Sequence, residues 1–249
     1  MDKDITAIVV TSVLPSHPST AIVDETIASI RHHLPNVEIL LQIDGLREEQ
    51  KDREADYTEY KKRILWKCLH EYTNVTPIVF EGHHHQTLMM KATMEYINTP
   101  LLLYVEGDAP FVTDHSIDFE KSKDMIFEGQ ANTIRYHFEG VIPKEHDNLM
   151  LGVKDGFMKT VQWSQRPHLS SVLYYKDVVL PNAEDGSFIE DRFHGIVQED
   201  YHRYGNIGWA KHRLWIYHPS KKNIKRTYHT DGRAGGRKYT SDDEAWGLV

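Results

Sequence analysis

From its start to Asp108, the chain alternates between two patterns of apolar and polar positions. Short continuous apolar runs such as Ile5–Val10 are typical of strands buried inside a sheet. Between these runs, apolar residues recur every three or four positions, which is typical of amphipathic helices. The pattern predicts strands at residues 5–10, 37–43, 75–80 and 101–105, with helices at 19–33, 55–72 and 86–97.

The order of these elements predicts the fold class. An alternating β-α-β-α-β-α-β series implies an α/β fold, in which helices cover both faces of a mostly parallel sheet. The pattern after Asp108 is less regular, and no repeat or long linker divides the chain. We therefore expect one domain spanning residues 1–249, in which helices at 118–128 and 188–203 accompany strands at 131–138, 157–163, 171–175 and 215–219.

Composition places the chain among ordinary globular proteins, since 40% of its residues are hydrophobic and 27% are charged. No apolar run is long enough to span a bilayer, and the amino terminus lacks the basic leader of a signal peptide. The one cysteine, Cys68, excludes an internal disulfide and a cysteine-rich metal site. These features predict a cytoplasmic protein in which Cys68 is a core thiol.

The net charge of −8 conceals an uneven distribution. The segment 211–238 contains nine Lys or Arg residues and one acid, Asp231, so it carries +8 while the rest of the chain carries −16. A basic tail on an acidic body favours contact between the tail and an anion. A solvated loop without a partner is the alternative, and the glycine-rich stretch 232–237 is expected to be flexible.

Polar side chains follow three of the four predicted strands at the point where each strand ends. Thr11 and Ser12 follow the first, Asp44 follows the second, and Glu106 and Asp108 follow the fourth. Ligands of open α/β sheets bind at this edge, so we expect these side chains to surround a ligand. Two carboxylates suit a hard divalent cation that carries substrate phosphates. The alternative is that Glu106 and Asp108 cap a turn or the following helix.

Several of these segments together resemble the GT-A fold glycosyltransferases, and most closely the family-two group that uses nucleotide-diphospho-sugars. The resemblance is carried by the opening strand and its loop 11–15, by residues 29–31, by 38–43 leading to Asp44, and by 99–108. It implies one GT-A catalytic domain. Its nucleotide-sugar-binding half would span 1–111, and its acceptor-side half with a basic C-terminal loop would span 112–249.

The resemblance also implies roles for the polar residues at the strand ends. Asp44 would contact the nucleotide base or ribose, and the Glu106-Gly107-Asp108 motif would hold a Mn²⁺ or Mg²⁺ ion that bridges the diphosphate. Asp108 is the expected metal ligand, because Glu106 stands where the family motif has Asp. The residues expected to bind the nucleotide-sugar are Thr11, Ser12, Asp44, Glu106, Arg233 and Arg237.

His218 and the run His83–His85 are further candidates for the metal site or the donor pocket. His218 follows a short apolar run, and a late histidine serves as a metal ligand in several GT-A enzymes, so we expect His218 beside Asp108. An ordinary surface histidine is the alternative. The run His83–His85 is expected to form a solvated loop that flanks the donor pocket, because consecutive residues rarely converge on one ion.

The resemblance places the catalytic base in the pair Glu190-Asp191. A carboxylate there would take the proton of an acceptor hydroxyl while the metal-bound diphosphate leaves from the opposite face, which inverts the anomeric centre. Neighbouring helix residues point in different directions, so only one carboxylate faces the acceptor, and we expect it to be Asp191. The alternative is that both acids only favour the positive end of their helix.

Three other functions fit parts of the sequence. A nucleotidyltransferase shares the parallel sheet and the metal-binding carboxylates, but it usually carries a glycine-rich basic signature after the first strand, and residues 11–18 contain neither glycine nor a basic residue. A nucleic-acid-binding module could use the basic tail, although the acidic body opposes general affinity for DNA. A glycosyltransferase acting on hydroxymethylated bases of DNA would combine both features. The acceptor is therefore expected to be a hydroxyl of a glycan, of a small molecule or of modified DNA.

Overall fold

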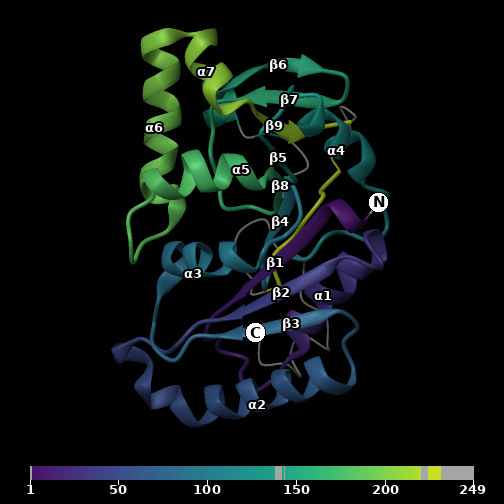
Figure 1. The fold of residues 1–249 in the computed structure, drawn as a ribbon, viewed down its shortest axis with the longest axis vertical. Helices are drawn as coiled ribbons and strands as arrows, with labels where there is room; N and C mark the ends of the chain where they lie inside the picture. Colours follow the sequence, from purple (N-terminus) through teal and green to yellow (C-terminus); the bar gives the residue numbers. More distant parts are fainter. Residues whose placement is uncertain (1, 138–141, 143, 220–223, 231–249) are drawn as a thin grey trace.

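The computed structural model describes residues 2–137, 142, 144–219 and 224–230. Within these residues, nine strands form one sheet in the order β3-β2-β1-β4-β8-β5-β9-β7-β6 (Figure 1). The strands are β1 (Ile5–Thr11), β2 (Glu38–Ile43), β3 (Val75–Val79), β4 (Leu101–Glu106), β5 (Thr133–Arg135), β6 (Met150–Lys154), β7 (Phe157–Thr160), β8 (His168–Ser171) and β9 (Leu214–Tyr217). The α-helices are α1 (Ala21–His33), α2 (Glu54–His70), α3 (His85–Thr93), α4 (Phe119–Phe127), α5 (Val172–Tyr174), α6 (Ile189–Tyr204) and α7 (Asn206–His212).

The first half of the chain forms the parallel part of the sheet. β1 pairs with β2 and β4, and β2 pairs with β3, all in parallel. Antiparallel pairing begins at β8, which lies between β4 and β5, and continues at β7. The predicted α/β fold class is confirmed, with a parallel unit built from β1 to β4 and a mixed extension built from the later strands.

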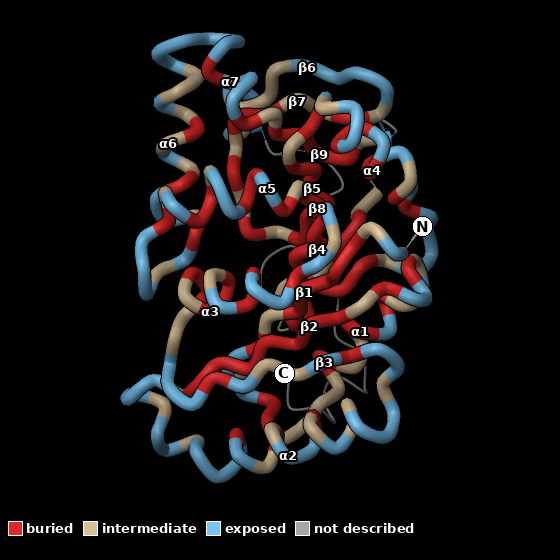
Figure 2. The backbone as a smooth tube through the Cα atoms, in the orientation of Figure 1, coloured by how far each residue is buried: buried red, intermediate tan, exposed pale blue. Residues whose placement is uncertain are grey.

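The two faces of the sheet bury two apolar layers, because successive strand residues point to opposite sides. In β4, Leu101, Leu103 and Val105 pack toward α1, α2 and α4, whereas Leu102 and Tyr104 pack toward α3, α5 and α6. Figure 2 shows the central strands buried and the outer helix faces exposed. In the described part of the chain, no helix is long and apolar enough to cross a membrane.

The expected strand at residues 171–175 is wrong. Its first residue ends β8, and the chain then turns into α5, whose start is capped by the Ser171 hydroxyl accepting from the Tyr174 N–H (3.4 Å). A π-helical turn, Tyr175–Val179, continues it. A short apolar run fits a buried strand or a buried helix equally well, and here a serine cap selects the helix.

The helical region after residue 188 is longer than predicted. α6 matches the expected helix, but the chain reverses at Gly205, whose φ is +56°, and α7 follows at once. A Cβ at Gly208 would lie 1.9 Å from the Asp200 carbonyl oxygen, so glycine lets α7 pack directly on α6. Strand β6 was likewise not predicted; its apolar stretch 150–153 is short and interrupted by Gly152, and most of its residues are exposed.

Candidate active site

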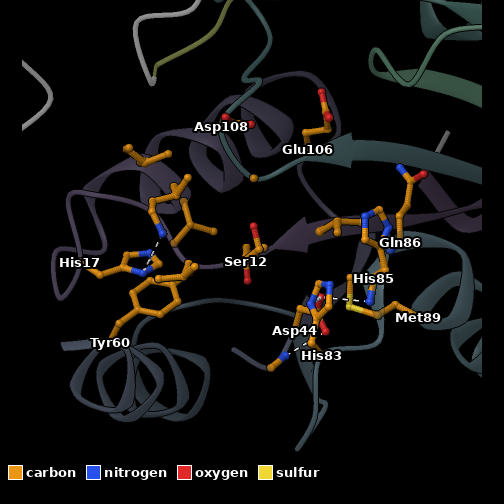
Figure 3. A pocket seen from close by; sticks show the side chains of 18 of the residues that line it. Ser12, His17, Asp44, Tyr60, His83, His85, Gln86, Met89, Glu106 and Asp108 are labelled. Carbon is orange, nitrogen blue, oxygen red and sulfur yellow. Dashed lines mark hydrogen bonds and ion pairs between the residues drawn. The ribbon is translucent and has the colours of Figure 1, made fainter. Parts of the chain in front are cut away.

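A cleft of about 370 Å³ opens at the carboxyl ends of β1, β2 and β4. Its wall is formed by the loop after β1, the residues around the start of α3, and the turn after β4 (Figure 3). The polar residues predicted at the strand ends all line it, namely Thr11, Ser12, Asp44, Glu106 and Asp108. The fold therefore gathers the donor-side candidates from three separate strands in one place.

The turn between Glu106 and Asp108 is held tightly against β1. Gly107 donates its N–H to a carbonyl of β1 (2.8 Å), and the Thr26 hydroxyl of α1 donates to the Gly107 carbonyl (2.7 Å). A Cβ at position 107 would lie 2.8 Å from the side chain of Thr11, so glycine is needed for this approach. The turn thereby fixes both carboxylates at the cleft, where Asp108 is only 6% exposed.

The C-terminal segment 224–230 lies beside this turn, which the sequence did not predict. Phe111 pairs with Thr227 in an antiparallel bridge. At the end of the segment, Thr230 donates its N–H to the Asp108 carbonyl (3.0 Å). A segment from the far end of the described chain therefore braces the backbone that carries the proposed metal ligand.

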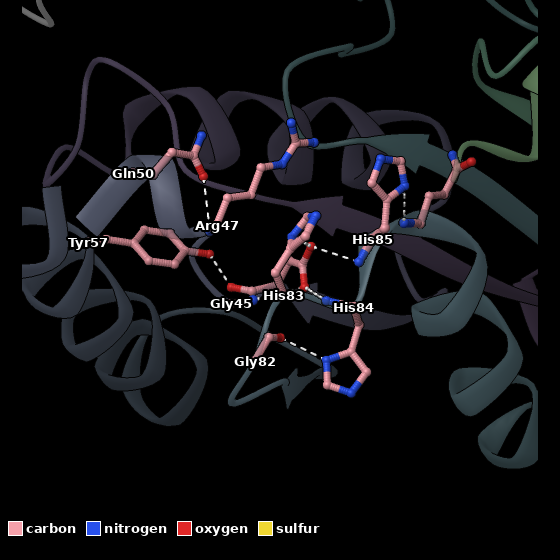
Figure 4. A network of polar contacts seen from close by, with 10 residues as sticks. Gly45, Arg47, Gln50, Tyr57, Gly82, His83, His84 and His85 are labelled. Carbon is pink, nitrogen blue, oxygen red and sulfur yellow. Dashed lines mark hydrogen bonds and ion pairs between the residues drawn. The ribbon is translucent and has the colours of Figure 1, made fainter. Parts of the chain in front are cut away.

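Asp44 organises the loop before α3. Its carboxylate accepts from the backbone N–H groups of Gly45 and His84 (both 2.8 Å) and His85 (3.2 Å), and it pairs with Nδ1 of His83 (2.8 Å; Figure 4). A Cβ at Gly45 would lie 2.3 Å from the facing backbone, so this close approach requires glycine. Asp44 lies in the cleft wall as predicted, but its side chain binds the protein's own loop.

The loop after β1 folds onto α2 through an aromatic stack. The His17 ring lies parallel to the Tyr60 ring with 3.8 Å between centroids, and its Nδ1 accepts from the Leu14 N–H (3.2 Å). Burial, with a smaller effect from the Arg53 charge, lowers the pKa of His17 to about 3. The stacked rings are almost fully buried, with His17 6% and Tyr60 2% exposed, so they anchor the loop after β1 on α2 and His17 adds no charge to this side of the cleft.

Gln86 connects the cleft to the second half of the chain. The side chain is buried and lines the cleft; its Nε2 donates to the Tyr104 hydroxyl, and its Oε1 accepts from the Ile189 N–H (2.9 Å). The adjacent Thr87 hydroxyl donates to the Ser187 carbonyl (2.8 Å). These bonds fix the start of α6 against the start of α3.

The two candidate bases have different environments. Asp191 is exposed and caps its own helix, because its Oδ2 accepts from the Phe188 N–H (3.2 Å). Glu190 is half-buried and accepts from the Gln165 N–H (2.9 Å), beside the residues that join α6 to the cleft. Each carboxylate accepts from one backbone N–H, and neither acid is among the described residues that line the cleft, so Asp191 as the base stays a prediction. Glu190 is the second candidate, because its partner Gln165 is hydrogen-bonded to Gln86 in the cleft wall.

His218 lies apart from the carboxylates of the cleft. It follows β9, and its N–H donates to the Gly156 carbonyl (2.8 Å). Burial and the nearby Arg226 charge lower the pKa of its imidazole. His218 is not among the described residues that line the cleft, and the described part of the chain contains no group of three His, Cys, Asp or Glu side chains that could hold a metal ion. The structure therefore does not unite His218 with Asp108.

Glu106 and Asp108 nevertheless offer a donor set that fits a divalent cation. Both are carboxylates at one end of the cleft, and hard cations prefer oxygen ligands. Magnesium commonly takes one or two protein carboxylates and completes its shell with phosphate oxygens and water. The pair thus fits an ion that arrives with a diphosphate, rather than one held by the protein alone.

Sequence reasoning missed several cleft residues, notably Tyr60, Gln86 and Tyr104. The run 83–85 was expected to flank the donor pocket, and His83 and His85 do line the cleft. Gln86 could have been predicted from its place in the chain, because it comes after the carboxyl end of β3 and lies in the first turn of α3. Tyr60 carries no such signal, because it reaches the cleft from the inner face of α2.

A buried histidine behind the cleft makes stability depend on pH. His168 stacks on Tyr104 and bonds to the Tyr175 hydroxyl (2.5 Å), and burial lowers its pKa to about 4. Below pH 6.5 the unfolded chain takes up a proton that the folded chain refuses, so stability falls as pH drops from 6.5 toward 4. We expect His168→Gln to flatten the slope of unfolding free energy against pH by up to about 1.4 kcal/mol per pH unit in this range.

Chemical denaturation at several pH values measures this slope. The matched control is His70→Gln at an exposed histidine, which should leave the slope unchanged. Equal slopes for the wild type and His168→Gln would contradict the prediction, even if the substitution lowers stability at pH 7.

Comparison with known proteins supports the fold assignment. No protein-family model matches the chain, and no curated protein matches it in sequence. Residues 1–349 of S. aureus TarS in complex with UDP-GlcNAc superpose with a TM-score of 0.56 at 11% identity, over 97% of this chain and 61% of that one. An apo UDP-glucose pyrophosphorylase superposes with a TM-score of 0.51 at 8% identity, over 93% and 94% of the two chains. The chain therefore has the GT-A type fold of nucleotide-diphospho-sugar transferases.

Proposed function

We propose that this protein transfers a sugar from a nucleotide-diphosphate donor to an acceptor hydroxyl. The observation that carries the proposal is the cleft itself, where Asp44, Glu106 and Asp108 meet at the ends of parallel strands. The structure that superposes at 11% identity contains UDP-GlcNAc, and a similar ligand suits the aromatic and acidic walls of this cleft.

The residues of the chain divide the proposed reaction between them. The part of the cleft between the loop after β1 and the loop before α3 receives the nucleobase end of the donor, and Glu106 and Asp108 hold the cation. When bound, that cation neutralises the charge that develops on the leaving diphosphate. Glu190 takes the proton of the acceptor hydroxyl as the new glycosidic bond forms. Attack opposite the leaving group inverts the anomeric centre.

Glycosyl transfer is favoured over nucleotidyl transfer by the loop after β1. Residues 11–18 contain neither glycine nor a basic residue, and His17 is buried in that loop with a pKa of about 3. A nucleotidyltransferase must neutralise a departing pyrophosphate, and this loop supplies neither a cation nor a flexible backbone for that purpose.

Three parts of the proposal concern residues or partners beyond the described cleft. Arg233 and Arg237 lie outside the described residues, and their contact with the diphosphate stays a prediction. The acceptor hydroxyl belongs to a glycan, a small molecule or modified DNA. His218 as a metal ligand also stays a prediction, with the structure giving it no support.

A ligand panel tests the proposed function directly. We expect nucleoside diphosphates and their sugar conjugates to raise the melting temperature in the presence of Mn²⁺, and to do so less without it, because a ligand that binds only the folded state stabilises by mass action. At one hundred times the dissociation constant the gain is about 2.7 kcal/mol. Nucleoside monophosphates serve as controls, since they lack the bridging diphosphate. A panel without any metal-dependent shift would contradict the function.

A further inference from the structure

The carboxylate of Asp44 has no acceptor position left for a ligand. A carboxylate offers about four lone-pair sites on its two oxygens. Oδ1 accepts from the N–H groups of Gly45 and His84, and Oδ2 accepts from the N–H of His85 and from Nδ1 of His83. The side chain is also only 2% exposed. A ligand at this point of the cleft therefore meets the residues that cover Asp44.

His83 is the histidine of this loop that presents a nitrogen to the cleft. Its ring lines the cleft, its side chain is 27% exposed, and Figure 3 shows it over Asp44. An ionised carboxylate is only an acceptor, so Nδ1 of His83 must carry the hydrogen that Asp44 receives. In the neutral ring, Nε2 then holds a lone pair and acts as an acceptor. Within the described residues, the ring makes no second hydrogen bond.

The two neighbouring histidines use their nitrogens elsewhere. Nδ1 of His84 bonds to the Gly82 carbonyl (2.7 Å), and its ring points away from the His83 ring in Figure 4. Nδ1 of His85 accepts from the Gln86 N–H (2.9 Å), and its ring packs against Phe188 with 4.4 Å between centroids. His85 also hydrogen-bonds the backbone of Ser187. His85 therefore joins the loop to the start of α6, whereas His84 bonds only within its own turn and points away from the cleft side of His83.

An acceptor fixed at this position distinguishes two classes of nucleobase. Uracil and guanine carry a ring N–H in the middle of the edge used for base pairing, at N3 and N1 respectively. Cytosine and adenine carry a lone pair at the equivalent atom, which an acceptor repels. An acceptor that loses its water to another acceptor when the base binds leaves both groups unsatisfied. The Nε2 atom of His83 thus suits a base with a ring N–H.

We propose that His83 reads the nucleobase of the donor and selects uridine or guanosine diphosphates over cytidine and adenosine diphosphates. The inference rests on the proposed function, and it assigns the recognition to His83 in place of Asp44. Asp44 acts through His83 as a positioning residue, since it fixes the ring and its tautomer.

Binding constants for four nucleoside diphosphates test the proposal. UDP, GDP, CDP and ADP are titrated in the presence of Mn²⁺ into the wild type, His83→Asn and His84→Asn. Asparagine places its amide N–H near the position of Nδ1, so His83→Asn keeps a donor for Asp44 and removes only the far nitrogen. We expect the wild type to bind UDP or GDP at least about tenfold more tightly than CDP and ADP. His83→Asn should bring that ratio close to one, and His84→Asn should retain it.

The outcomes separate this inference from the function on which it rests. A wild type that binds none of the four diphosphates overturns both. If the wild type binds them with manganese dependence but prefers CDP or ADP, or if His83→Asn keeps the wild-type ratio, the assignment of His83 is overturned and the proposed function stands. Melting temperatures of the two variants verify that the loop is intact, and a loss of binding to all four bases equally in His83→Asn also overturns the assignment.

Discussion

We expect Asp108→Asn to remove the metal-dependent part of nucleotide binding. The substitution keeps the size of the side chain and the backbone bond to Thr230, but it replaces the charged oxygen ligand with a neutral amide. Carboxylate coordination of a cation that bridges a diphosphate is worth several kcal/mol. The affinity for a nucleoside diphosphate in Mn²⁺ should therefore fall at least about 100-fold, or roughly 2.7 kcal/mol. Calorimetric titrations with and without manganese measure this difference.

A matched control is available in the same loop. Asp114 is exposed and lies outside the cleft, so Asp114→Asn removes an equal charge a short way along the chain and should leave the metal-dependent affinity unchanged. Glu106→Gln should have a smaller effect than Asp108→Asn, because Asp108 is the more buried of the two. An equal gain in affinity from manganese in the wild type and in Asp108→Asn would show that the ion is held elsewhere.

The parallel half of the fold was predictable because its signals are local. The runs 5–10 and 101–105 are continuous and apolar, and they appear as β1 and β4, each extended by one position at its C-terminal end. Once four strands alternate with helices, chain topology alone brings their carboxyl ends to one edge. That is why Ser12, Asp44 and Asp108 could be placed in one site before any contact was known.

The contacts that the sequence did not predict involve partners that local sequence does not encode. The role of Asp44 depends on the loop that follows β3, and the support of Asp108 depends on Thr230 in the C-terminal segment. The sequence pattern of a carboxylate at a strand end is the same whether its side chain faces a ligand or a backbone N–H. The position of His218 could not be predicted for a similar reason. In a mixed sheet, the sequence of a short strand does not reveal at which edge of the sheet its C-terminal end lies.

The adjacent acids Glu190 and Asp191 differ in their hydrogen bonds, and this difference bears on which of them could act as the base. The position of α6 was predicted to within a single position, so the pair was correctly placed at a helix start. The capping bond from Phe188 to Asp191 could have been anticipated, since an acid at the third helical position is a recognised capping partner. Neither acid is among the described residues that line the cleft, and assigning the cap to Asp191 leaves Glu190 as the acid bonded to Gln165.

We therefore expect Glu190→Gln to abolish transfer while donor binding persists. Glutamine keeps the shape of the side chain and an oxygen for the Gln165 N–H, but it cannot accept the proton of an attacking hydroxyl. Removal of a general base typically costs about 10²–10⁴-fold in rate. Release of nucleoside diphosphate from a sugar donor, with water or an identified hydroxyl as acceptor, measures the rate, and the dissociation constant of the donor should change little.

Asp191→Ala is the matched comparison, because it removes the neighbouring carboxylate and its cap. It should lower stability by roughly 1 kcal/mol, or about 2–4 °C in melting temperature, and it should leave the rate within a few-fold of the wild type. Glu190→Gln is thus expected to lower the rate, and Asp191→Ala is expected to lower the stability. If Asp191→Ala is inactive at a temperature where it remains folded while Glu190→Gln turns over normally, Asp191 is the base, and the helix start must rearrange when the donor binds.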